Sequence, residues 1–375
     1  MKKLNNLNGN FEYELLDKNQ HVVGLREKLT VLYPHHYSDI LWWELHDPSL
    51  ESEGYYKLFY YEQSVLKHII LFKYFSETQR KIFQISKKCT ISVEDIENIS
   101  YILFYEFDKV QQIIFQEIFE PDLKQSPKMV FEKPINDIII SDLPNSMDVY
   151  MKSLGKPTRK KIQLMTNRIA RDFPDFKVHY YEKNDILFEQ IEKLVSLNRI
   201  RMITTGEKPG ITDTDCKILY QYALTSGFGF LCVCVIDGKI VGGTLNFIIG
   251  ERAYLQVIAH DNLYNQYSMG QIALVNVTKF LIEEKKNIKY FHLMRGSQEY
   301  KFRHGGISHD LYTIRVFRNN DVRYFGRKSV SIIKKYFRKY KIKLRSNKII
   351  FTIYTKLKKM KTKLMYFKRN KKASS

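Results

Sequence analysis

One stretch in the second half of the chain decides the fold: FLCVCVIDGKIVGGTLNFIIGERAYLQVIAHDNLYNQYSMGQ, residues 230–271. Its first seven residues are almost continuously apolar, as expected of a strand that is buried on both faces. Asp237-Gly238 is a strong hairpin signal, and Gly250-Glu251 turns the returning chain into a third strand. That strand leads through a glycine-containing turn into a helix that starts at Ser268. The stretch therefore predicts an antiparallel meander that ends in a helix.

The segments around this meander complete a mixed sheet. Before it, the apolar spacing predicts three helices, over 157–172, 186–202 and 212–225, and one strand over 176–182. After it, we expect a strand over 289–294, a short helix over 298–303 and a last strand over 311–317. Helices and strands in this order are typical of a sheet with helices on both faces. The second half of the chain is thus predicted to be mixed α/β.

The first half shows a weaker pattern of the same kind. Two aromatic and β-branched runs, 55–62 and 65–75, predict a hairpin. Further expected elements are strands over 82–85, 101–107 and 135–140, a helix that starts at Ser92, and a second helix over 108–119. We place a boundary near 145–150, which predicts domains over 1–148 and 149–318 and a tail over 319–375.

Composition narrows the class of protein. The chain has 375 residues, which suits two domains, and 44% of them are hydrophobic, which excludes a disordered protein. Four cysteines are too few for a disulfide scaffold, and no apolar run approaches the roughly 18–20 residues that span a bilayer. The N-terminal residues lack a secretory signal. These features predict a cytoplasmic protein.

The positive charge is concentrated at one end of the sequence. The net charge is +21, and residues 311–375 hold 22 lysines and arginines against one acid, which accounts for all of it. Residues 1–310 are therefore neutral and, by composition, are not a nucleic-acid-binding surface.

The basic tail predicts two amphipathic helices, over 331–344 and 350–361. Such helices bind anionic membrane surfaces, where each lysine or arginine contributes about 1 kcal/mol. We therefore expect residues 331–372 to hold the protein peripherally at the inner face of the membrane. Two other interpretations remain open, a tail that binds RNA and a solvated extension.

Four motifs follow one another across residues 145–315. They are the basic helix with Arg159, Lys160 and Lys161; Leu194 to Arg199 as Leu-x-x-Leu-x-x-Arg; Asp261, Tyr264, Ser268 and Gly270, with Met269 between the last two; and Arg295-Gly296 followed by Tyr300-Lys301. Together they resemble the GNAT superfamily of acyltransferases, and most of all its CelD-like branch, which is related to the FemAB peptidyltransferases. That branch has proline where Met269 stands. The resemblance implies a tandem GNAT-like fold, with a degenerate N-terminal copy and a complete C-terminal copy.

The turn at Ser268 to Gly270 suits donor binding. A helix that starts there presents unpaired backbone N–H groups and the positive end of its dipole, which bind phosphate oxygens. Gly270 lacks a Cβ where a diphosphate must come close. We therefore expect the diphosphate of acetyl-CoA or another acyl-CoA here, with contacts from Gln256, Ser268, Met269, Gly270 and Gln271. The alternative is structural, with Ser268 only as an N-cap and Gly270 only as a packing residue.

Side chains at the strand ends would surround the reacting thioester. The family match favours Tyr300 as the acid for the leaving thiolate and Lys301 as the holder of an anionic group. A packed tyrosine and a solvated lysine explain the same two residues. Asp261 is the first candidate for the general base, although aspartate is also frequent in turns. His260 is the other candidate, because its pKa lies near neutrality.

Further residues are expected to contact the acceptor, namely Arg199, Tyr254, Arg295 and Glu299. Arg201, also near the end of its helix, is explained more simply as a complement to the helix dipole. No metal site is predicted.

The sequence thus predicts an acyltransferase that moves an acyl group, expected to be acetyl, from acyl-CoA to an amine or hydroxyl. The acceptor is expected to be a sugar or lipid-linked glycan of polysaccharide or envelope biosynthesis, and this pathway comes from the resemblance alone. Two other functions remain open. One is FemAB-like aminoacyl transfer from charged tRNA, and the other is a non-catalytic role in a membrane-associated polysaccharide assembly.

Overall fold

The computed structural model describes residues 2–6, 9–75, 80–119, 121, 128–132 and 134–318, so the predicted tail helices lie outside the described residues. The contacts divide the chain into two compact units. The first comprises the residues up to Ile139, Met294–Ser297 and the described residues from Ile307 onward. The second comprises Ile140–Leu293 and Gln298–Gly306. Among the described helices, none has the length and apolarity that crossing a membrane requires.

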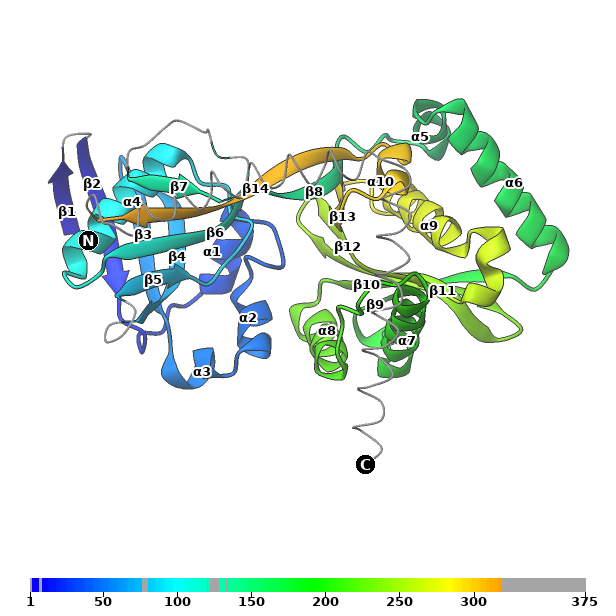
Figure 1. The fold of residues 1–375 in the computed structure, drawn as a ribbon, viewed down its shortest axis with the longest axis horizontal. Coiled ribbons are helices and arrows are strands. Elements are labelled where there is room, and N and C mark those ends of the chain that lie inside the picture. The colour runs from blue at the N-terminus through cyan, green and yellow to red at the C-terminus, as the bar shows by residue number, and fades with distance from the viewer. Residues whose placement is uncertain are drawn as a thin grey trace, which may run out of the picture. The chain divides into compact units, whose positions relative to one another are not determined.

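The first unit is built on a mixed sheet with the strand order β1-β2-β3-β4-β5-β6-β14-β8, in which β7 also pairs with β14 (Figure 1). Its strands are β1 (Lys2–Asn6), β2 (Gly9–Leu16), β3 (Tyr56–Glu62), β4 (Val65–Phe75), β5 (Lys81–Gln84), β6 (Gln112–Phe119), β7 (Met129–Phe131), β8 (Ile135–Ile140) and β14 (Ile307–Phe317). Its helices are α1 (Leu25–Leu32), α2 (Ile40–His46), α3 (Ser49–Glu53) and α4 (Val93–Glu106). The parallel pair β5 and β6 is joined by α4, as a crossover connection requires.

Two elements expected in the first half are wrong. Residues 101–107 were expected to form a strand, but 101–106 are the last turns of α4, which begins at its predicted N-cap Ser92. Their apolar side chains continue the buried side of that helix, and Ile102 and Leu103 are completely buried. Residues 108–119 were expected to be helical, but most of them form β6. This strand lies between β5 and β14 and is buried on both faces, so its apolar residues show helical spacing and not the alternation of a half-buried strand.

The second unit contains the predicted meander. Its strand order is β13-β12-β11-β10-β9. The strands are β9 (Lys177–Glu182), β10 (Gly229–Ile236), β11 (Lys239–Ile249), β12 (Arg252–His260) and β13 (Tyr290–Arg295). The helices are α5 (Met147–Ser153), α6 (Lys156–Asp172), α7 (Phe188–Thr204), α8 (Asp213–Ser226), α9 (Met269–Glu283) and α10 (Glu299–Arg303), with the 3-10 turns η1 (Lys183–Asp185) and η2 (Asn262–Tyr267). Helices α7 and α8 cover one face of this sheet, and α9 covers the other (Figure 1).

The two units repeat one order of elements. In the first unit, β2 is followed by α1 to α3, then β3, β4, β5, α4 and β6. In the second unit, β9 is followed by α7 and α8, then β10, β11, β12, α9 and β13. In each unit the first four of these strands are antiparallel neighbours, and the last pair is parallel across a helix. The chain is therefore a tandem of two similar mixed α/β folds, as the sequence predicts.

The last strand differs in its assignment. The sequence placed residues 311–317 at the end of the second domain, which was predicted to span 149–318. The structure assigns β14 to the first unit, where it pairs in antiparallel fashion with β6, β7 and β8. The apolar pattern identifies such a segment as a strand but does not say which sheet it joins. The first unit accordingly closes with a strand that comes late in the chain.

Candidate active site

Helix α9 begins at an unusual turn. Ser268 ends η2 in the left-handed region, with φ 52° and ψ 44°, and its side chain makes no capping bond. Its carbonyl accepts the N–H groups of Gln271 and Ile272 at 2.8 and 3.2 Å. Within the described part of the chain, the N–H groups of Met269 and Gly270 have no hydrogen-bond partner. The helix therefore starts with two free donors at the positive end of its dipole.

The strand that leads to this turn separates from its neighbour. β12 pairs with β13 only from Arg252 to Tyr254, opposite Tyr290 to His292. β12 then continues to His260, six residues beyond this pairing. The ladder between β11 and β12 is also irregular, because Leu245 lies opposite Val257 and Asn246 lies opposite Leu255. Gln256 is left as the extra residue of a bulge, and such bulges re-aim the chain beside functional sites.

A cavity of about 240 Å³ lies where β12 meets the start of α9. Its lining comes from β12, α7, the η2–α9 turn and α10, and consists of Arg201, Ile258, His260, Asn265, Ser268, Gly270, Gln271 and Tyr300. No acidic side chain is among these described lining residues. Polar groups that converge on a cavity of this kind are the usual sign of a binding site.

His260 packs directly over Gly270. A Cβ added to Gly270 would lie 2.9 Å from Nδ1 of His260, so the absence of a side chain at this position makes room for the ring. The other ring nitrogen, Nε2, is 2.9 Å from Oδ1 of Asn265. Because an amide oxygen only accepts, Nε2 carries the proton and Nδ1 keeps a free lone pair. Burial lowers the pKa of His260 below 6.5 and the charge of Arg201 acts in the same direction, against the opposing effects of Asn265 and Asp261.

Tyr300 brings a hydroxyl to the cavity from α10. Burial raises the pKa of Tyr300 above its usual range, although the nearby charge of Arg201 opposes this shift. The hydroxyl is therefore protonated at neutral pH. A neutral imidazole and a protonated phenol beside one cavity supply a base and an acid.

The structure brings five of the sequence-predicted residues to this cavity: His260, Ser268, Gly270, Gln271 and Tyr300. Met269 and Tyr254 point into the core instead, and Tyr254 packs on the ring of His292. Lys301 is only 4% exposed, so a freely solvated lysine is excluded there. Asp261 accepts the N–H of Leu263 and caps η2, which is the turn role that the sequence left open.

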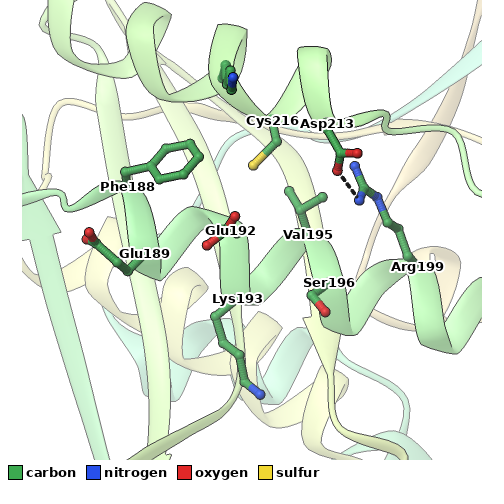
Figure 2. A pocket seen from close by; sticks show the side chains of 10 residues that line it. Phe188, Glu189, Glu192, Lys193, Val195, Ser196, Arg199, Asp213 and Cys216 are labelled. Atoms are coloured by element: carbon green, nitrogen blue, oxygen red, sulfur yellow. Dashed lines mark hydrogen bonds and ion pairs between the residues drawn. The ribbon is translucent and has the colours of Figure 1, made fainter.

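The remaining predicted residues lie elsewhere. Glu299 is exposed and pairs with Arg303 at 2.5 Å. Arg295 belongs to the first unit and pairs there with Glu117. Arg199 donates to Asp213 at 2.5 Å and lines a separate cavity of about 500 Å³ between α7 and α8, where Figure 2 shows the two side chains facing each other.

Three cavity residues were not selected from the sequence, Arg201, Ile258 and Asn265, and Arg201 is the charged one among them. The signal was present, because Arg201 follows Leu194 by seven positions and Leu197 by four, which places it on the same side of the helix. Both leucines are buried. A cation that continues the buried side of α7 must end at the sheet, whereas Arg199 points toward α8.

The helix of the first unit that corresponds to α9 begins differently. The corresponding helix, α4, is capped by Ser92, whose hydroxyl accepts the N–H of Asp95 at 3.0 Å. Its first turn also carries Glu94 and Asp95. Carboxylates at the start of a helix take the place that an anionic ligand would need. A helix start without a side-chain cap or acidic residues is thus found in the second copy and not at α4, as expected if the first copy is degenerate.

Comparison with known proteins identifies the second copy. Residues 168–302 match the family model described as the acetyltransferase (GNAT) domain. The second unit carries a GNAT-type acyltransferase domain. This confirms the GNAT resemblance, while the CelD-like branch stays a prediction. No curated protein sequence matches the chain.

Comparison with solved structures finds proteins that are similar to this chain over most of their length. The crystal structure of FemX is 10% identical, has a TM-score of 0.55, and is matched over 80% of this chain and 97% of its own. A conserved protein of unknown function from Bacteroides thetaiotaomicron is 11% identical with a TM-score of 0.49, over 80% and 99% of the two chains. A tandem GNAT protein from the clavulanic acid biosynthesis pathway is 8% identical with a TM-score of 0.40, over 83% and 100%. The likeness to FemX supports a shared fold over both units.

Proposed function

We propose that this protein is an acyl-CoA-dependent acyltransferase that transfers an acyl group, expected to be acetyl, to an amine or hydroxyl of a sugar-containing precursor. The observation that carries the proposal is the start of α9. Two free backbone N–H groups, the helix dipole and a glycine without a Cβ meet there beside a cavity of the GNAT domain. Such a helix start binds phosphate oxygens without a basic side chain, and the diphosphate of CoA fits that requirement.

The side chains of the cavity fit acyl transfer. His260 accepts the proton of the acceptor's amine or hydroxyl at Nδ1, as its nitrogen or oxygen forms the new bond to the thioester carbonyl carbon. The carbon–sulfur bond then breaks, and the hydroxyl of Tyr300 gives its proton to the leaving thiolate. Exchange with solvent restores both side chains. Each group holds the protonation state that its step requires near neutral pH.

The acceptor and the location of the reaction rest on the sequence. The resemblance to the CelD-like branch supports a polysaccharide or envelope precursor, and the basic residues 331–372 support work at an anionic membrane surface. The alternative donor, an aminoacyl-tRNA, and the non-catalytic alternative are separated from this proposal by titration calorimetry with acetyl-CoA, CoA and uncharged tRNA.

Replacing Gly270 by glutamate tests the proposal. The new side chain would collide with His260 and place a negative charge at the start of α9. We expect CoA to stabilise the wild-type protein by about 2.7 kcal/mol at a concentration 100-fold above its Kd, and Gly270→Glu to abolish this stabilisation. Thermal unfolding with and without CoA measures it.

Gly210→Glu is the matched control, because a Cβ at Gly210 meets no atom within 4 Å. It adds the same charge to the same unit and should leave the stabilisation by CoA unchanged. If CoA stabilises the Gly270→Glu protein as much as the wild type, α9 does not hold the donor. If CoA stabilises neither the wild type nor the Gly270→Glu protein, the chain does not use acyl-CoA.

A further inference from the structure

Arg201 stands in the cavity as an uncompensated cation. Its Nε is buried and has no hydrogen-bond partner, and its Nη2 lies 3.8 Å from the sulfur of Met202. Within the described residues, no carboxylate forms an ion pair with this guanidinium, and no acid lines the cavity. Arg199, two positions earlier, is paired with Asp213 and also donates to the carbonyl of Ile211. Among the described residues, helix α7 therefore carries one arginine with a carboxylate partner and one without, and each has one buried nitrogen that makes no hydrogen bond, Nη2 of Arg199 and Nε of Arg201.

A buried donor on a charged group is costly unless something pairs with it. The other side chains around Arg201 provide no negative charge to pair with it. His260 is a neutral ring whose protonation Arg201 opposes, and Tyr300 keeps its proton. A ligand oxyanion in the cavity would satisfy the guanidinium with charge-assisted hydrogen bonds.

This anion is distinct from the donor's diphosphate. Arg201 enters the cavity from α7, whereas the free N–H groups of Met269 and Gly270 belong to α9, on the opposite face of the sheet (Figure 1). The charge of Arg201 acts on both His260 and Tyr300, the two groups that handle protons. Its oxyanion therefore belongs next to the reacting groups, on the acceptor.

We propose that the acceptor carries a carboxylate or phosphate group and that Arg201 binds it. This inference rests on the proposed acyl transfer and narrows its substrate class to anionic amines or alcohols, such as amino acids or phosphorylated amino sugars. Arg201 then selects the acceptor and orients its nucleophile toward the thioester.

Pairs of acceptors that differ only in the anion test this assignment. The pairs are glycine with glycinamide and glucosamine 6-phosphate with glucosamine, with acetyl-CoA as donor and thiol release as the readout. The wild type should favour the anionic member of at least one pair by roughly tenfold or more in kcat/KM, as expected for a hydrogen-bonded charge. Arg201→Gln should remove that preference, mainly through KM, and Arg201→Lys should restore part of it.

Three further measurements make the outcome decisive. CoA should stabilise Arg201→Gln as it does the wild type, and Lys193→Gln, which removes one positive charge from the same helix, should keep the preference. Loss of CoA stabilisation in Arg201→Gln would overturn the proposal, because Arg201 would then hold the donor. The proposal would also be overturned if Arg199→Gln alone lost the preference, because Arg199 would then bind the anion. It would be overturned as well if CoA stabilised the wild type and the wild type showed no preference. A wild type that CoA does not stabilise contradicts the proposed function instead.

Discussion

At the scale of single residues, the sequence located the helix start, but it selected Arg199 for the acceptor, whereas the structure places Arg201 in the cavity beside that helix and Arg199 in another one. Ser268 and Gly270 could be selected from the local strand–turn–helix order, and Tyr300 was selected from the resemblance to the GNAT superfamily. Which of Arg199 and Arg201 reaches the cavity depends on how α7 is rotated against the sheet, and a family motif does not contain that information. The buried leucines of the same helix do contain it, because they fix which side of α7 faces inward.

His260 is expected to act on the proton transfer and not on donor binding. His260→Ala should lower kcat by roughly 10²- to 10⁴-fold, the usual contribution of a general base. Stabilisation by CoA should stay within the error of the wild-type value, because the backbone N–H groups of α9 remain. Steady-state kinetics and thermal unfolding with CoA measure the two effects.

The opposite result for His260→Ala would be weaker CoA binding with an unchanged kcat. His260 packs against Gly270, so a role beside the diphosphate would weaken CoA binding and leave kcat close to that of the wild type. Asn265→Ala is the companion variant, because it removes the acceptor of the Nε2 proton and frees the tautomer without removing the ring. It should lower kcat less than His260→Ala does.

At the scale of elements, the prediction was best where turns and alternation define each segment. The β10–β11–β12 meander follows the sequence within about two residues, because Asp237-Gly238 and Gly250-Glu251 fix its turns. Prediction failed at the end of α4 and at β6, whose residues are mostly buried and therefore do not show the period of their own element. Burial in a sheet interior erases the period of two, so only the tertiary structure separates the two classes.

The end of α10 supplies a pH-sensitive contact with α5. His304 is completely buried, and its carbonyl accepts the hydroxyl of Tyr150 at 3.0 Å, while its Nε2 has no partner within the described residues. Burial, aided by the charge of Lys161, lowers the pKa of His304 to about 4. The unfolded chain binds this proton below pH 6.5 and the folded chain does not, so the free energy of unfolding falls as the pH drops from 6.5 to 4.

The expected loss from this one side chain is about 3 kcal/mol at pH 4 relative to pH 7. Urea unfolding at a series of pH values measures this loss. His304→Phe keeps a ring without a titrating group, so its free energy of unfolding should fall by about 3 kcal/mol less between pH 7 and pH 4 than that of the wild type. Equal pH dependence in the two proteins would mean that His304 is protonated in the folded state.

At the scale of the whole molecule, the sequence shows where the positive charge lies, but it does not show which of the two copies carries the site. Composition is additive, so the neutral body and the basic end could be read directly from the chain. The repeat could not be recognised in this way, because β2 to β6 and β9 to β13 share an order of elements and not a sequence pattern. The capped, acidic start of α4 and the free start of α9 then explain why one copy is expected to bind the donor while the other completes the fold.

The charge at the C-terminal end leads to the last prediction. Full-length protein should pellet with vesicles that contain anionic phosphatidylglycerol and should remain in solution with purely zwitterionic vesicles. A 1–320 truncation, which keeps β14, should remain in solution with both. Binding by the full chain should weaken as salt rises toward 1 M, where the screening length falls to about 3 Å. Unchanged stabilisation of the truncated protein by CoA verifies that its acyltransferase domain is intact, and equal pelleting of the two proteins would exclude the tail as the membrane contact.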